Sequence, residues 1–254
     1  MVVISLQVHP MVLMTKDIKD KIRRLKKERT LPLPPEVKQP IRSDEVETDI
    51  TAVQSFISSF EYNYSGVPFV PLKKSRSLLY VYKTAQDIIR IGLPIQCVEA
   101  TFLGCHLTAG MKGVDRVPLS FKSKCQGSIH RHMVLAIRYN GKWGALGISR
   151  RGDLMSKDLK YSSLGELVLD YNQAYRKSFH NLLTVYVGLP FSHDKSTDNP
   201  VKWRAQKVHI YKNDEENIVS VLDAYSNAML KMSDVYVSTG KIELESAVEL
   251  PLLI

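Results

Sequence analysis

The sequence has few cysteines and no long apolar run, and each shortage excludes a class of protein. Three cysteines among 254 residues are too few for a disulfide-built scaffold and suit a reducing compartment. No apolar run reaches the roughly 18 residues that cross a bilayer. The apolar start, residues 1–14, has no basic residue ahead of it and is interrupted by Gln7, His9 and Pro10. We therefore expect no signal peptide, no membrane span and a cytoplasmic protein.

Motifs for nucleotides and metals are also scarce. No glycine-rich phosphate loop occurs, so a nucleotide-dependent activity has no support. Cys125, His130 and His132 have a spacing that zinc ligands can have. Cys105 and His106 lie nearby, but no Cys-x2-Cys pair accompanies them. We predict neither a metal nor a cofactor.

Acidic residues are outnumbered, because 26 Asp and Glu face 35 Lys and Arg and leave a formal net charge of +9. This excess favours an anionic partner, which could be nucleic acid, a membrane surface or an acidic protein segment. Residues 16–29 combine eight basic and three acidic residues with a helical spacing of apolar ones. The proline-rich residues 30–40 follow and cannot be helical. We predict a basic, Pro-rich N-terminal extension over residues 1–44.

The rest of the sequence alternates between helical and strand-like patterns, without an internal repeat. Apolar spacing and capping residues predict helices over 48–60, 75–92, 93–107, 162–180 and 216–232. Alternation predicts strands over 116–124, 129–139, 142–149, 181–189 and 202–212. Helices followed by mostly antiparallel strands, with helices packed on them, predict an α+β fold. We assign the compact domain to residues 45–212 and a C-terminal helix and tail to residues 213–254.

The Asn-Gly pair at 140–141 is the strongest hairpin signal in the sequence. A two-residue type I′ loop there pairs Tyr139 with Lys142, and the same register places His132 opposite Ser149. Directly opposed side chains share one face, with Cβ atoms about 5 Å apart. We therefore predict a His132–Ser149 contact on a face of small residues. The other face is apolar and is expected to meet a core.

Cys97 is predicted in the first turn of the helix over 93–107, which Pro94 opens. The positive end of a helix dipole favours the thiolate, although most helical cysteines are simply small buried hydrophobic residues. The small residues beside His132 leave room for such a helix end. A thiol, an imidazole and a group that orients the imidazole are the nucleophilic set of a cysteine hydrolase. The alternative for His132 is an ordinary core histidine.

Several segments resemble the vasohibins. GALGISRR, at 144–151, is the most specific, and the resemblance runs from about residue 45 to about residue 212. The segments that carry it are 61–78, 96–108, 128–155, 164–175 and 191–194. It implies a transglutaminase-like, papain-like cysteine protease core. It also implies removal of the C-terminal tyrosine of α-tubulin by a triad of Cys97, His132 and Ser149.

The resemblance also implies roles in substrate binding. Arg150 matches the arginine that binds the terminal carboxylate of the substrate, and Tyr62 matches a tyrosine near the scissile carbonyl. Position 96 is a lysine in animal vasohibins and is Gln96 here, which can donate a hydrogen bond to the carboxylate but brings no charge. The residues that match a basic groove for the acidic tail are Lys73, Lys74, Arg76 and Arg131.

The implied partners are the α-tubulin tail and microtubules rather than nucleic acid, and the implied location is the microtubule cytoskeleton of the cytoplasm. Animal vasohibins also bind a small helical chaperone, the small vasohibin-binding protein, through an N-terminal segment that this sequence matches poorly. Both a chaperone-like partner and a self-sufficient enzyme stay open. The alternative functions are a non-catalytic microtubule- or polyanion-binding module and a transglutaminase-like acyl transferase.

Overall fold

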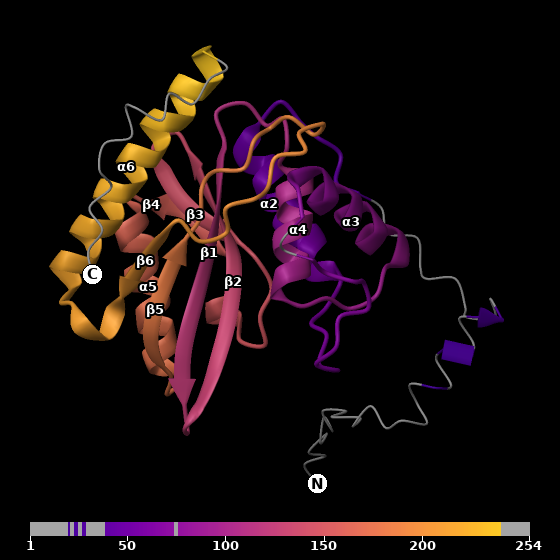
Figure 1. Cartoon of the computed structure of the whole chain (residues 1–254), viewed down its shortest axis with the longest axis horizontal. Helices are drawn as coiled ribbons and strands as arrows, with labels where there is room; N and C mark the ends of the chain where they lie inside the picture. Colours follow the sequence, from indigo (N-terminus) through magenta and orange to yellow (C-terminus); the bar gives the residue numbers. More distant parts are fainter. Residues whose placement is uncertain (1–19, 21–22, 25–26, 29–38, 74–75, 240–254) are drawn as a thin grey trace, which may run out of the picture.

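The predicted α+β fold is confirmed by a computed structural model, in which helices cover both faces of one six-stranded antiparallel sheet (Figure 1). The structure describes residues 20, 23–24, 27–28, 39–73 and 76–239, with side chains as far as residue 231. The predicted basic helix over 16–29 lies mostly outside the described residues, and so does most of the proline-rich stretch. No helix in the described part of the protein is long and apolar enough to cross a membrane.

The sheet has the strand order β4-β3-β2-β1-β5-β6, and every neighbouring pair is antiparallel. Its strands are β1 (Asp115–Cys125), β2 (Ser128–Tyr139), β3 (Lys142–Leu146), β4 (Lys157–Tyr161), β5 (Asn181–Val187) and β6 (Gln206–His209). Strand β4 was not predicted from the sequence. Its five residues, KDLKY, include three charged side chains and give no strand-like apolar signal.

Two groups of helices enclose the sheet (Figure 1). On one face lie α2 (Val46–Ser59), α3 (Leu78–Ile91) and α4 (Cys97–Leu107). On the other lie α5 (Leu164–Lys177) and α6 (Glu215–Thr239). Of two short 3-10 helices, η1 (Gly152–Leu154) lies between β3 and β4 in the sequence, and η2 (Ile210–Lys212) lies between β6 and α6.

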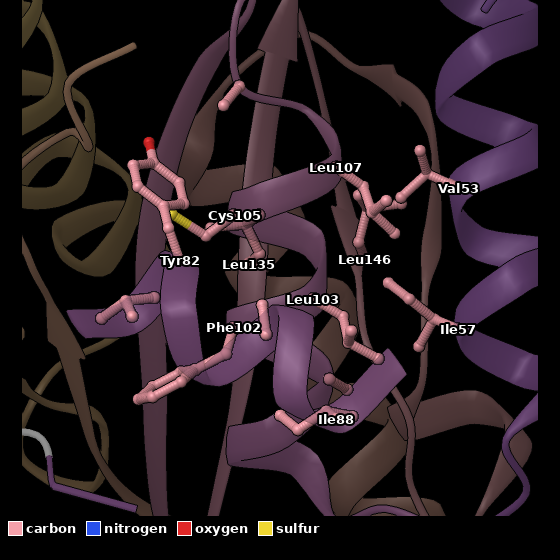
Figure 2. Packing of buried hydrophobic residues seen from close by; sticks show 14 of the residues in the cluster. Val53, Ile57, Tyr82, Ile88, Phe102, Leu103, Cys105, Leu107, Leu135 and Leu146 are labelled. Carbon is pink, nitrogen blue, oxygen red and sulfur yellow. The ribbon is translucent and has the colours of Figure 1, made fainter. Parts of the chain in front are cut away.

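The first core lies between α2, α3, α4 and the sheet. Figure 2 shows Val53 and Ile57 of α2 facing Leu103 of α4 and Leu146 of β3. Helix α4 lies close against β2, since a Cβ at Gly104 would come within 3.0 Å of a Leu135 methyl carbon. The apolar face of the hairpin meets a core, as predicted, and contributes Met133, Leu135, Ile137, Leu146 and Ile148.

The second core fills the opposite face of the sheet and corrects one expectation. Val134, Ala136 and Ala145, the small residues that were expected to accommodate the cysteine-bearing helix, are buried under α5 and α6. Helix α4 packs on the other face instead. Small side chains can accommodate any helix that packs on them. The pattern of small residues in the hairpin therefore did not identify which helix covers this face.

The hairpin register is confirmed over five residue pairs, from Tyr139↔Lys142 to Leu135↔Leu146. Asn140 and Gly141 have φ of 49° and 76°, the left-handed values that a type I′ turn requires. The ladder ends at Leu146, however, and Ser149 lies beyond β3. The strand pairing therefore does not extend to a direct His132–Ser149 pair, because a register constrains only residues that stay in the strand.

Candidate active site

Cys97 is the first residue of α4, with Gln96 as the N-cap. The sequence pattern had placed it two or three residues into a helix that began near Pro94. Gln96 and Glu99 form a capping box, in which the buried Glu99 carboxylate accepts a 2.7 Å hydrogen bond from the Gln96 N–H. The half-buried Cys97 thiol thus lies at the positive end of the helix dipole, which stabilises a thiolate.

The other two cysteines differ from Cys97 in their surroundings. Cys105 is fully buried in α4, and burial raises its pKa to about 12, so it stays a protonated thiol. Cys125 is half-buried and ends β1, close to the tip of the β1–β2 hairpin. Of the three cysteines, Cys97 is the one that is both partly exposed and located at a helix N-terminus.

A loop after α2 lies beside the nucleophile. The backbone of Asn63 donates to the Ile95 carbonyl at 2.7 Å, and Ile95 donates to the Glu61 carbonyl at 3.1 Å. These bonds join Tyr62 and Ile95 in an isolated bridge. Tyr62 is therefore held next to the segment that leads directly into Cys97.

His132 lies on β2, half-buried, with its ring stacked on Phe121 at a centroid distance of 6.1 Å. Its Nε2 donates to the carbonyl oxygen of Leu154 at 2.7 Å, since a carbonyl can only accept. This bond assigns the proton to Nε2 and leaves Nδ1 as the acceptor nitrogen. Burial lowers the pKa of His132 to about 4, against the opposing effect of that hydrogen bond. The imidazole is therefore neutral near pH 7 and able to take a proton.

An aromatic layer connects the surroundings of Cys97 and His132. Burial raises the pKa of Tyr175, and the charge of Cys97 raises it further. Cys97 therefore lies within electrostatic range of this α5 side chain. The Tyr175 ring is 5.6 Å from Phe121, the ring on which His132 stacks. Tyr175 therefore interacts electrostatically with Cys97 and lies beside the ring on which His132 stacks.

Ser149 lies half-buried after β3, and its Oγ accepts a 3.3 Å hydrogen bond from the Arg151 N–H. In the described structure, the oxygen bonded to the His132 ring is the Leu154 carbonyl. Sequence reasoning missed Leu154, because every residue has a carbonyl and no side chain marks the one that is used. The place of Ser149 in the triad stays a prediction.

Arg150 is exposed and lies over two tyrosine rings. Its guanidinium carbon is 5.5 Å from the Tyr62 ring centroid and 6.0 Å from that of Tyr64. Burial raises the pKa of Tyr62, while the hydrogen bond and positive charge of Arg150 oppose the rise. The structure brings Arg150 and Tyr62 together, as their proposed roles require, and adds Tyr64, which no sequence motif had singled out.

The residues of the expected basic groove are exposed where they are described. These are Lys73, Arg76 and Arg131, and Lys74 lies outside the described residues. Arg131 directly precedes His132 on β2 and is paired across the sheet with Lys122. Among the described residues, no group of three or more His, Cys, Asp or Glu side chains is placed to hold a metal ion.

A cysteine at a helix N-terminus, followed in the sequence by a histidine on an antiparallel sheet, is the arrangement of a cysteine hydrolase of the transglutaminase-like kind. The Vasohibin family model matches residues 2–230, and the chain belongs to this family. Tubulinyl-Tyr carboxypeptidase 1 of Mus musculus is 37% identical over 180 residues, which are 71% of this chain and 48% of the mouse protein. The chain thus spans about half the length of that relative.

Proposed function

We propose that this protein is a thiol carboxypeptidase that removes the C-terminal tyrosine of α-tubulin. Membership of the vasohibin family and the name of the mouse relative support this substrate. The observation that carries the proposal is the combination of a cysteine nucleophile and a histidine base in suitable protonation states. Cys97 begins a helix, and His132 is held neutral with Nδ1 as an acceptor.

In the first half of the reaction, Nδ1 of His132 takes the proton of the Cys97 thiol, and the thiolate attacks the carbonyl carbon of the last peptide bond. The Cys97 N–H at the helix start stabilises the oxyanion, with help from the neighbouring Tyr62 hydroxyl. The imidazolium then gives its proton to the leaving amine. Tyrosine departs and leaves a thioester on Cys97.

In the second half, His132 removes a proton from water, which attacks the thioester carbon. The C–S bond breaks, the shortened tail leaves with a new terminal carboxyl group, and the imidazolium returns its proton to the Cys97 sulfur. The Leu154 carbonyl accepts from Nε2–H throughout, so it fixes the ring orientation and stabilises the transient imidazolium. No other proton carrier is needed for the cycle.

The substrate is recognised by charged and polar side chains. The Arg150 guanidinium can pair with both oxygens of the terminal carboxylate, and Gln96 can add a hydrogen bond. Lys73, Arg76 and Arg131 are exposed cations that attract a glutamate-rich tail.

The test is to incubate the purified protein with tubulin and to follow the C-terminus of α-tubulin by mass spectrometry. Loss of one tyrosine, absent with Cys97→Ala, supports the proposal. An amine adduct would indicate an acyl transferase, and unchanged tubulin that still pellets with the protein would indicate a binding module. Tyrosine loss that persists in Cys97→Ala would refute the nucleophile assignment.

The same proposal places the protein in the cytoplasm on microtubules, which imaging of the tagged protein in cells tests directly. Dependence on a partner resembling the small vasohibin-binding protein is tested by comparing yield and kcat for the protein expressed alone and with that helical chaperone. Equal values would show a self-sufficient enzyme.

A further inference from the structure

Arg150 lies in a corner formed by two aromatic rings. Tyr62 and Tyr64 meet edge to face, with centroids 5.1 Å apart and an interplanar angle of 64°. The Arg150 guanidinium carbon lies over both ring faces, at 5.5 Å and 6.0 Å. Both distances are within the range of about 6 Å in which a ring face attracts a cation.

The loop that carries the two rings is held in place independently of Arg150. Asn63, between the tyrosines, is 2% exposed. Its side chain accepts from the Ser65 N–H at 2.9 Å and donates to the Val67 carbonyl at 2.9 Å. Its backbone N–H bonds to Ile95, two residues before the nucleophile. The loop that carries the two rings is therefore attached to the segment that leads into Cys97.

Arg150 is less constrained by its own surroundings. It is exposed, and within the described part of the protein it forms no ion pair. A free arginine side chain loses much rotamer freedom when it binds a carboxylate. The Tyr64 ring face attracts the guanidinium charge without occupying its N–H donors, so it can hold Arg150 and leave donors for Tyr62 and a substrate.

We propose that Tyr64 is a positioning residue for Arg150, which keeps the guanidinium oriented toward the terminal carboxylate of the substrate. This inference rests on the proposed function, in which Arg150 reads that carboxylate. Tyr62 cannot be used to test the corner cleanly, because it also has a role beside the scissile carbonyl. Tyr64 is 41% exposed and lies outside the cores, so it can be replaced without opening either core.

The expected effect follows from the strength of an exposed cation–π contact. Loss of the Tyr64 ring should weaken binding of a free-acid peptide about two- to fivefold. Binding of the matching C-terminal amide should change little, because an amide offers no carboxylate to Arg150. In steady-state kinetics the loss should appear as a higher KM with kcat nearly unchanged.

The experiment measures Kd for tail peptides ending in tyrosine, as free acid and as amide, on the Cys97→Ala protein, which does not cleave them. Tyr64→Trp, Tyr64→Phe and Tyr64→Leu form a series with decreasing attraction for a cation. The matched control is Tyr211→Leu, since Tyr211 is another exposed tyrosine with a cation, Lys212, over its ring at 6.0 Å. Melting temperatures verify that each variant folds.

The preference for free acid over amide should fall in the order Tyr64→Trp, Tyr64→Phe, Tyr64→Leu and stay unchanged in Tyr211→Leu. A preference that is equal across the Tyr64 series would overturn the positioning role, and the ring-bearing variants decide the matter even if Tyr64→Leu does not fold. If the parent Cys97→Ala protein itself shows no preference for the free acid, the proposed carboxypeptidase function fails instead.

Discussion

The imidazole of His132 donates from Nε2 to the backbone carbonyl of Leu154 at 2.7 Å. That carbonyl ends η1, whose turn is closed by a 3.1 Å hydrogen bond from the Leu154 N–H to the Arg151 carbonyl. The next residue, Met155, is fixed to α5 by the Tyr171 hydroxyl at 2.6 Å. The orientation of the proposed base therefore depends on a backbone turn that is fixed to a buried helix.

This arrangement predicts unequal effects at two positions of the proposed triad. His132→Ala should lower kcat by roughly a hundredfold or more, because it removes the general base. Ser149→Ala should cost about tenfold or less, since its hydroxyl accepts one neutral hydrogen bond from Arg151. Single-turnover rates on a tail peptide measure both. Equal losses would assign the orienting role to Ser149 after all.

The low pKa of His132 predicts a pH-dependent stability. Because its folded pKa of about 4 lies below the usual 6.5, the unfolded protein binds more protons between these values. The contribution of His132 is complete above pH 6.5 and is lost as the pH falls toward 4. It amounts to about 2 kcal/mol between pH 7.5 and pH 5.

Urea unfolding at these two pH values checks the sign and the size. Burial also lowers the pKa of His106 and His193, so the wild-type protein should lose more than this amount. His132→Gln should make the loss smaller by about 2 kcal/mol. A variant with the same pH dependence as the wild-type protein would show that His132 keeps an ordinary pKa in the fold.

The parts of the fold that the sequence predicted are those that local chemistry determines. The Asn140-Gly141 turn set the hairpin register, as expected, and α3 ends at Gly92 in the left-handed conformation, close to the predicted end of that helix. The start of α4 was misplaced, because Pro94 suits a first turn but Gln96 and Glu99 form the cap that begins the helix. Which helix covers which face, and which carbonyl reaches His132, depend on tertiary packing that no short pattern encodes.

Replacing Gln96 with lysine should lower the stability of the fold and improve substrate binding. The Gln96 side chain accepts a hydrogen bond in the α4 capping box, and lysine cannot accept one. Gln96→Lys should therefore destabilise the fold by about 1 kcal/mol, or roughly 2–4 °C in Tm. The added charge should lower KM for free-acid peptides. Gln96→Ala separates the effects, because it should lose the same stability without the gain in KM.

Arg150 predicts a loss of substrate affinity. A hydrogen bond to a charged group contributes about 1.5–3 kcal/mol, so Arg150→Ala should lower kcat/KM about ten- to a hundredfold for free-acid peptides. Arg150→Lys should recover part of the loss, because lysine keeps the charge but lacks the bidentate fork. Amide peptides should be cleaved poorly by every variant. If the wild-type enzyme cleaves acid and amide at equal rates, the terminal carboxylate is not read.

The excess of positive charge and the proposed basic groove predict a KM that depends on ionic strength. The protein has a formal net charge of +9, and the three described cations proposed to attract the acidic tail, Lys73, Arg76 and Arg131, are exposed. Salt screens exposed charges beyond about 8 Å at physiological strength, so added salt should raise KM for tubulin and change kcat less. Arg76→Gln should reduce the slope of KM against salt. The control is Arg90→Gln, which should leave that slope unchanged, because Arg90 is an exposed arginine of α3 that pairs with Asp87. A KM that stays constant across the titration would show that electrostatic attraction does not bring the tail to this site.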